Sequence, residues 1–298
     1  MKAAAAPQPT VDETLKRISQ EYESLSKQLQ AIARYVEKNR DRIGIEGIRK
    51  FAEQCGVQPS AIVRFSKRFG FSGFSALQAM FRENIYLQLT PGARYTTRIR
   101  MSMESVRHIP SNVEVAKDFL DGSIVGMQEL LHSMDFSAFQ NAVEMLSKTD
   151  CVWIEASRRS FPIAAYLEYA LQHTDKRVLL IDSMVSMRMG QMHSVREGDV
   201  MMAISFHPYA EETLAVARDA VERGAKVIAI TDSGLSPLAQ LAHVVLVVHE
   251  NTTYGFRSLC GAMGLAQSLF VSLACSLELL GLPVHAPKMA GPYAAPVS

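Results

Sequence analysis

The apolar residues of the first ninety positions recur at helical spacing. One set, with members three or four positions apart, predicts a helix that continues to Asn39; its members are Leu25, Leu29, Ile32 and Val36. The first ten residues are rich in Ala, Pro and Gln and show no such period. We therefore expect a flexible N-terminal arm over residues 1–20, with helices after it.

Two shorter helices are predicted on either side of Gly56. The first ends at this glycine, because glycine adopts positive φ at low cost, and its apolar residues are Ile45, Ile48, Phe51, Ala52 and Cys55. The second starts at Pro59, since proline suits the first turn of a helix, and ends at Gly70. Its inward side should hold Ile62, Val63, Phe65 and Phe69. Ser75 is expected to cap a fourth helix.

After an irregular, polar stretch, the pattern changes from helices alone to strands alternating with helices. The short β-branched runs cover residues 151–156, 177–182, 199–205, 226–231 and 244–248. Runs such as Val227–Ile230 are apolar on both faces, which is typical of a parallel sheet covered by helices. The predicted fold class is α + α/β: an all-helical helix-turn-helix domain followed by a doubly wound, five-stranded parallel-sheet domain.

Length and composition agree with two soluble domains. The chain has 298 residues, about twice a typical domain, with 48% hydrophobic and 20% charged residues. The apolar run 261–284 is interrupted by Gln267 and Glu278, which favours a buried helix over a membrane span, and we expect a cytoplasmic protein. The expected divisions are an arm over 1–20, a helix-turn-helix domain over 21–89, a linker over 90–112, a sheet domain over 113–285 and a tail over 286–298.

Charge is distributed unequally between the two parts. Residues 1–100 carry 17 Lys and Arg against 9 Asp and Glu, whereas residues 101–298 carry 14 against 21. The balances of +8 and −7 almost cancel in the net charge of +1. Such asymmetry indicates a part that faces nucleic acid, joined to a part that does not.

The helix that starts at Pro59 is the candidate reader of DNA. With its apolar side turned inward, the residues left outside are Gln58, Ser60, Ala61, Arg64, Lys67 and Arg68. A guanidinium and an amide suit bidentate contacts to base edges, whereas Lys67 and Arg68, with Arg49 and Lys50 of the preceding helix, suit contacts to phosphates. The alternative is a helical hairpin whose basic residues are only a solvated face.

The motif supports the first interpretation. The segment 62–75, Ile-Val-Arg-Phe-Ser-Lys-Arg-Phe-Gly-Phe-Ser-Gly-Phe-Ser, preceded by Ala-Glu-Gln-Cys-Gly-Val over 52–57, resembles the N-terminal domain of RpiR/MurR-type bacterial transcriptional regulators. That family joins such a domain to a SIS (sugar isomerase) domain that senses phosphosugars. The resemblance places Pro59, Ser60, Arg64 and Lys67 at recognition-helix positions. Gln58 and Ala61 stand where the family commonly has Ser and Thr, so the operator cannot be inferred.

Two polar loops after predicted strands are the candidate effector site, because ligands of such sheets lie beyond the carboxyl ends of the strands. Each loop leads into a helix whose free amides favour an anion. The candidate residues are Ser157, Arg158, Arg159, Ser160, Ser205, His207, Tyr209, Glu212 and Thr213. The alternative is that the arginines pair with Glu155, Glu211 or Glu212 and only close the loop. Asp232, Ser233 and Ser236 are expected to be turn and cap residues.

The second part of the chain resembles SIS domains over about 115–280, most clearly at Ala229–Ala239. The family's G-x-G-x-S loop is replaced here by Ala156, Arg158 and Ser160. In its S-x-S-G-x-T loop the end residues are five apart, whereas Ser205 and Thr213 are eight apart. The resemblance therefore implies a reshaped pocket for an anionic metabolite, a sugar phosphate.

The sequence thus predicts a transcriptional regulator that controls genes of carbohydrate metabolism. Its expected partners are double-stranded operator DNA, the small anionic effector and further copies of itself, as a homodimer or homotetramer. We expect no catalytic residue, cofactor, metal or membrane. Two alternatives stay open: an isomerase that uses Glu250, His193 or His207 as its base, or a regulator whose SIS-like domain only oligomerises.

Overall fold

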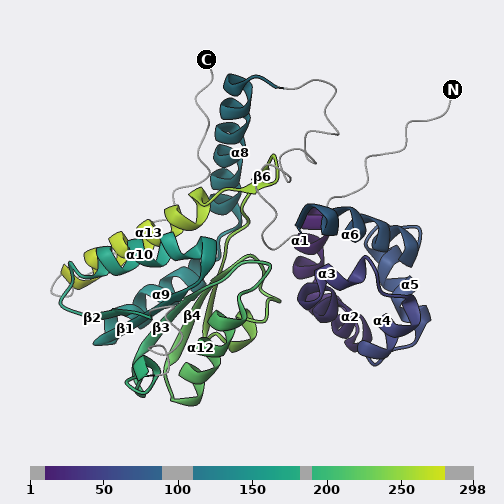
Figure 1. Cartoon of the computed structure of the whole chain (residues 1–298). Coiled ribbons are helices and arrows are strands. Elements are labelled where there is room, and N and C mark those ends of the chain that lie inside the picture. Colours follow the sequence, from purple (N-terminus) through teal and green to yellow (C-terminus); the bar gives the residue numbers. More distant parts are fainter. Residues whose placement is uncertain (1–10, 89–109, 182–189, 279–298) are drawn as a thin grey trace.

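The computed structural model describes residues 11–88, 110–181 and 190–278, which form a helical domain (11–88) and a sheet domain (110–278) (Figure 1). The predicted linker and the predicted C-terminal tail therefore lie almost entirely outside the described residues. The helical domain contains α1 Val11–Glu21, η1 Tyr22–Ser24, α2 Lys27–Lys38, α3 Arg40–Ile43, α4 Ile48–Gln54, α5 Pro59–Arg68 and α6 Phe74–Gln88.

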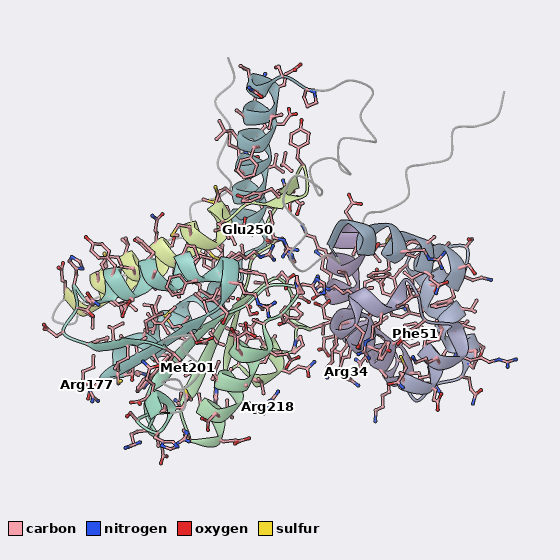
Figure 2. All side chains as sticks on the ribbon, in the orientation of Figure 1. Arg34, Phe51, Arg177, Met201, Arg218 and Glu250 are labelled. Carbon is pink, nitrogen blue, oxygen red and sulfur yellow. The ribbon has the colours of Figure 1, made fainter. Side chains whose placement is uncertain are left out.

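Aromatic side chains fill the centre of the helical domain. Four phenylalanines are fully buried in one cluster: Phe51 of α4, Phe65 of α5, Phe69 directly after α5, and Phe81 of α6. Figure 2 labels Phe51 among these helices. Gly56 and Gly70 have φ of +64° and +92°, so the two predicted helix ends are confirmed. Both glycines are needed because other residues rarely adopt this conformation.

The structure differs from the sequence prediction before α2 and before α4. A helix, α1, occupies Val11–Glu21, where we expected a flexible arm. Val11, Leu15 and Ile18 pack into the core at helical spacing, and the Ala- and Pro-rich composition that suggested an arm is confined to the first ten residues. Ile45, expected among the buried apolar residues of a helix, is 72% exposed in the loop before α4.

The sheet domain has five parallel strands in the order β2-β1-β3-β4-β5, which confirms the predicted doubly wound fold. The strands are β1 Cys151–Ala156, β2 Arg177–Leu180, β3 Val200–Ile204, β4 Lys226–Thr231 and β5 Val244–Val247. The helices are α8 Asn112–Ser133, α9 Phe136–Lys148, α10 Phe161–Leu171, α12 Glu211–Glu222 and α13 Cys260–Glu278, with η2 Arg158–Ser160 and η3 Ala239–Leu241. A small antiparallel pair, β6 Thr252–Thr253 and β7 Phe256–Arg257, precedes α13.

The central strands β1, β3 and β4 are buried on both faces, as their continuous apolar runs predict, whereas the edge strand β2 is partly exposed. Ile154 and Met202 lie in register on one face with the residues of α9, α10 and α13, whereas Trp153 and Met201 face the side covered by α12. Among the described residues, α13 is the one helix long and apolar enough to cross a membrane. Its inner residues pack in the sheet core: Leu265, Leu269 and Leu273.

The helical domain lies beside the edge at which the strands end (Figure 1). Asp232 follows the last residue of β4 and contacts Arg40 of α3, while Tyr209 follows β3 and contacts Glu37 of α2. Figure 2 shows Glu250, beyond β5, at this edge and Arg177, the first residue of β2, far from it. The helical domain, which holds the DNA-binding candidate, therefore contacts the sheet domain at the edge where the effector is expected to bind.

Candidate DNA interface and effector site

Helix α5 presents a polar outer face to solvent. Gln58, Ser60, Arg64, Lys67 and Arg68 are exposed, and Pro59 is half-buried at the first position of the helix. Arg49 and Lys50 of α4 are exposed as well. The structure therefore places these predicted DNA contacts on the surface, with the apolar side of α5 against the domain core.

Ala61 is the exception among the predicted DNA contacts. Its exposed fraction is 1%, because it lies four residues before Phe65 and eight before Phe69, on the same buried side of α5. The prediction that Ala61 faces outward is therefore wrong. Val63, expected inside, is only half-buried, and Ser66 is buried instead, with its hydroxyl donating to the Ile62 carbonyl at 2.9 Å.

Both arginines of α5 contact neighbouring helices through exposed groups. Arg68 donates to Glu21 Oε2 at 3.1 Å and to Ser24 Oγ at 3.1 Å, while Arg64 donates to Gln28 Oε1 at 3.4 Å. Exposed contacts of this kind contribute at most about 1 kcal/mol each. They therefore leave both guanidiniums able to turn toward a phosphate or a base.

Arg158, in the loop after β1, does not face an open site. It is exposed, and its guanidinium pairs with Glu212 through Nε at 3.2 Å. Its φ is +56°, so the backbone keeps a left-handed conformation at the position where the family's loop has its second glycine. This conformation costs a non-glycine residue about 1 kcal/mol. The pairing is the alternative described above, in which an arginine closes the loop.

The other polar residues of the two loops are largely engaged within the sheet domain. Ser157 Oγ and Thr213 Oγ1 donate to Glu155 Oε1 at 3.1 and 3.2 Å, and all three side chains are buried. Ser205 Oγ accepts the backbone N–H of Ala210, and Ser160 is buried beside the start of α10. Arg159 donates to the carbonyl of His207 at 2.8 Å, which ties the two loops together.

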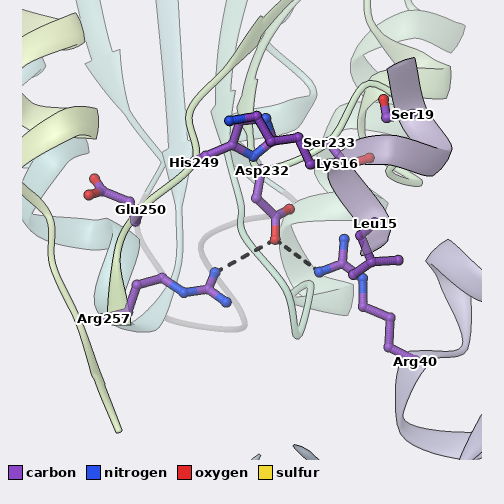
Figure 3. A pocket seen from close by; sticks show the side chains of 9 residues that line it. All are labelled: Leu15, Lys16, Ser19, Arg40, Asp232, Ser233, His249, Glu250 and Arg257. Carbon is purple, nitrogen blue, oxygen red and sulfur yellow. Dashed lines mark hydrogen bonds and ion pairs between the residues drawn. The ribbon is translucent and has the colours of Figure 1, made fainter. Parts of the chain in front are cut away.

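Tyr209 and His207 belong instead to a buried polar cluster between the domains. This Arg40 cluster consists of Glu37, Arg40, His207, Tyr209, Asp232 and Arg257. Arg40 Nη1 donates to Asp232 Oδ2 at 3.3 Å, its Nη2 donates to Tyr209 Oη at 3.2 Å, and it forms an ion pair with Glu37. Arg257 reaches Asp232 from the other side, with 3.6 Å between Nη1 and Oδ2 (Figure 3).

Burial and the neighbouring charges shift the pKa values of three side chains in the Arg40 cluster. Burial alone would raise the pKa of the Asp232 carboxyl, but Arg40 and Arg257 outweigh it and hold this pKa well below its usual range. Burial and the charge of Arg40 lower the pKa of His207 to about 3, so this imidazole is neutral at pH 7. Burial and Asp232 raise the pKa of Tyr209 well above 10.

A cavity of about 50 Å³ lies next to the Arg40 cluster, between the domains. Its lining residues are Leu15, Lys16, Ser19, Arg40, Asp232, Ser233, His249, Glu250 and Arg257 (Figure 3). Four of these residues belong to the helical domain, three to α1 and Arg40 to α3. The other five come after β4 or β5 in the chain. The cavity therefore lies at the edge predicted to bind the ligand, but beyond β4 and β5 rather than beyond β1 and β3.

Several residues of this region carry no signal of a site in the sequence. Glu37, Arg40 and Arg257 carry no motif, and Asp232 was expected only in a turn. Ser236 accepts the Ala239 N–H at 3.0 Å and Ser233 accepts the Leu235 N–H at 3.1 Å, as expected of turn residues. Asp232 instead joins the two domains, across 192 positions from Arg40.

Three residues were candidates for the base of an isomerase: Glu250, His207 and His193. Glu250 accepts the backbone N–H groups of Gly261 and Ala262, at 3.3 and 2.7 Å, at the start of α13; burial nevertheless raises its pKa. His207 is neutral inside the Arg40 cluster, and His193 is exposed before β3. Two of the three side chains are therefore already engaged, Glu250 by the N–H groups of α13 and His207 within the Arg40 cluster.

Comparison with known proteins identifies both parts of the chain. Residues 12–86 match the model of the helix-turn-helix domain of the rpiR family, and residues 145–273 match the SIS domain model. The NanR protein of Vibrio vulnificus, solved in complex with ManNAc-6P, is 20% identical over 89% of this chain and 92% of its own, with a TM-score of 0.52. The sugar isomerase domain of an RpiR transcription factor from Sphaerobacter thermophilus is 24% identical over 55% of this chain and 91% of its own, with a TM-score of 0.53. At these identities the likenesses show a common fold.

Proposed function

The chain is an RpiR-type protein, an rpiR-family helix-turn-helix domain joined to a SIS domain, and we propose that it is a transcriptional regulator that binds operator DNA and senses an anionic metabolite of the sugar-phosphate class. The genes it controls would then be those of carbohydrate metabolism. The observation that carries the proposal is the outward-facing basic side of α5, on a domain whose partner domain has the SIS fold.

DNA binding is supported by the geometry and charge of the helical domain. Helix α4 braces α5, and the exposed side chains Ser60 and Arg64 lie in the first turns of α5, the part that enters a major groove about 12 Å wide in such motifs. Lys67 and Arg68, in the last turn, suit contacts to phosphates. The excess of basic residues before position 100 adds a sequence-independent attraction to DNA.

An anionic effector is supported by the cations at the carboxyl edge of the sheet. Arg159, Arg257 and Lys16 lie at or beside this edge, where doubly wound sheets bind their ligands. NanR, of the same fold, was solved with a sugar phosphate. The exchange of the family's glycine for Arg158 makes the pocket differ from that of the family, so the proposal names the class of effector rather than a compound.

A homodimer or homotetramer is supported by an uncovered apolar face on α8. The exposed residues on this helix include Val113, Leu120, Ile124, Val125, Met127 and Leu131. An apolar stripe of this size is unusual on a monomer. A two-fold assembly would present two α5 helices to operator half-sites about one turn of DNA apart.

We propose further that the protein is not an enzyme and acts in the cytoplasm without a cofactor. An isomerase needs a base within reach of a carbon-bound proton. Of the three candidate bases, Glu250 caps α13 and His207 is enclosed by the Arg40 cluster. An isomerase would also have no use for an exposed basic helix.

The test joins DNA binding to ligand binding in one assay. Fluorescence anisotropy would measure the affinity of the full chain for a duplex selected from genomic DNA, with and without sugar phosphates that include ManNAc-6P. At least one sugar phosphate should change the Kd about fivefold or more, and its unphosphorylated sugar should not. Turnover of a sugar phosphate would support the isomerase instead, and absence of any ligand-induced thermal shift would support a domain that only oligomerises.

A further inference from the structure

We propose that the cavity between the two domains binds the phosphate group of the effector, and that residues of both domains hold it. This inference rests on the proposed function, because the ligand is the metabolite that the sheet domain senses. It adds the place of the site and a direct role for the helical domain, through Lys16 of α1 and Arg40 of α3.

The size of the cavity suits a small polar group. About 50 Å³ is room for a few water molecules or for one group as large as phosphate. Leu15 is the one apolar side chain in a lining that otherwise consists of charged, hydroxyl or imidazole groups. A polar cavity of this kind excludes an apolar ligand, because the lining would lose its hydrogen bonds.

Donors without a full set of partners line the cavity. Arg40 is only 7% exposed, and its Nε has no hydrogen-bond partner among the described residues. The Lys16 ammonium can donate three hydrogen bonds, and the structure gives it Glu129 Oε2, at 3.5 Å on the solvent side. The hydroxyls of Ser19 and Ser233 add donors of the kind that phosphate oxygens accept.

The two carboxylates of the cavity are already engaged. Asp232 accepts from Arg40 and from the backbone N–H of His207, and it pairs with Arg257. Glu250 accepts two backbone N–H groups of α13, and Figure 3 shows its carboxylate turned away from Arg40. Three cations therefore line the cavity with two carboxylates that have donors of their own. Glu37 and Glu129 pair with Arg40 and Lys16 from outside this lining, so a bound phosphate would share these two cations with them.

Because both domains contribute to the lining of the cavity, binding of the ligand depends on how the two domains are arranged. Lys16, Ser19 and Arg40 belong to the helical domain, whereas Ser233 and Arg257 belong to the sheet domain. A phosphate held by both groups binds the docked arrangement more tightly than a separated one and shifts the population toward it. By linkage, DNA that prefers one arrangement must alter the affinity for the phosphate.

The test measures binding of inorganic phosphate to the full chain by isothermal titration calorimetry, with chloride at matched ionic strength. Lys16→Met removes the cation and keeps the stem of the side chain; Lys38→Met, at an exposed position of α2 outside the cavity, is the matched control. We expect Lys16→Met to raise the Kd for phosphate at least tenfold and Lys38→Met to leave it unchanged. Arg257→Met should also weaken binding, and equal thermal midpoints without ligand show that a variant is folded.

An unchanged Kd in Lys16→Met, or no phosphate binding to the wild-type chain at 20 mM, overturns the proposed site. The same titrations with a sugar phosphate and its parent sugar identify the source of the phosphate, since only the phosphorylated sugar should bind. If a sugar phosphate alters DNA affinity equally in wild type and Lys16→Met, this inference fails and the proposed function stands. If the wild-type chain neither binds DNA nor responds to any sugar phosphate, the proposed function fails.

Discussion

Arg40 Nη1 lies 3.3 Å from Asp232 Oδ2, which joins the helical domain to the carboxyl edge of the sheet. Both side chains are less than a tenth exposed. Arg257, Tyr209 and the backbone N–H of His207 also contact Asp232, so one carboxylate connects the loops after β3 and β4 with α3. Any ligand or variant that changes this carboxylate's partners must also change how firmly the two domains are held together.

Removal of the Asp232 charge should destabilise the protein. Asp232→Asn removes the carboxylate that the guanidiniums of Arg40 and Arg257 share and leaves Arg40 with Glu37 alone, which costs about 3–5 kcal/mol for a buried pair of this type. Urea denaturation would measure the free energy of unfolding. Asp219→Asn, which breaks the pair between Asp219 and Arg223, each about a third exposed, is the control and should cost less than about 1 kcal/mol. Equal losses in the two variants would contradict the role of Asp232.

His207 should make stability depend on pH below neutrality. Its folded pKa is about 3, set by burial and by Arg40, with Asp232, Arg257 and Arg159 also nearby. Between pH 6.5 and about 3 the unfolded chain binds a proton that the folded chain does not, so stability falls as the pH falls, by about 1.4 kcal/mol per unit. Asp232, whose pKa is depressed, adds a loss only below about pH 4.

The comparison of His207→Gln with wild type isolates this effect. Denaturation from pH 7 to pH 4.5 should give a shallower loss of stability in His207→Gln. His173→Gln, at an exposed histidine, should keep the wild-type slope. The same slope in all three proteins would show that folding does not lower the pKa of His207.

Substitutions on α5 should separate base recognition from phosphate contact. Arg64→Ala should cost about 1–3 kcal/mol of binding to the preferred site and relax sequence preference. Lys67→Ala should weaken binding to every DNA about equally and lower the salt dependence by about one unit of slope. Anisotropy titrations at several salt concentrations give both quantities. Equal effects of both variants on specific and random DNA would mean that the roles are misassigned.

The apolar face of α8 should hold the copies of the chain together. Leu120 and Ile124 lie one turn apart and are 63% and 55% exposed, so Leu120→Glu with Ile124→Glu places two charges on the same stripe. Light scattering coupled to gel filtration should show a dimer or tetramer for wild type and a monomer for the double variant. Ile45→Glu, an equally exposed position of the helical domain, should keep the wild-type mass. A monomeric wild type would contradict the proposed assembly.

The sequence predicted those features that depend on residues near one another in the chain. Gly56, Pro59 and Gly70 mark the ends of α4 and α5, and both glycines have the positive φ that this requires. The apolar runs predicted all five strands, because burial of a strand on one or both faces leaves a compositional pattern. Helical period was informative for whole helices, but it did not distinguish the buried Ala61 from its exposed neighbours.

The sequence did not predict contacts between distant residues. Arg158 was expected to face an anion, but its partner Glu212, 54 positions away, is brought beside it by the packing of α12 against β1 and β3. The contact of Arg40 with Asp232 depends on how the two domains meet, which no local pattern encodes. The motifs therefore predicted the two domains and their loops, and the structure added the partners of the side chains between them.

The most direct test is the ratio of affinities for two duplexes of equal length, one selected from genomic DNA and the other a shuffled version of it. Anisotropy at 150 mM salt would measure both Kd values for the full chain. Reading of base edges by α5 predicts a ratio of at least about a thousand in favour of the selected duplex. A ratio near one, or no binding to either duplex at 50 mM salt, would contradict the account.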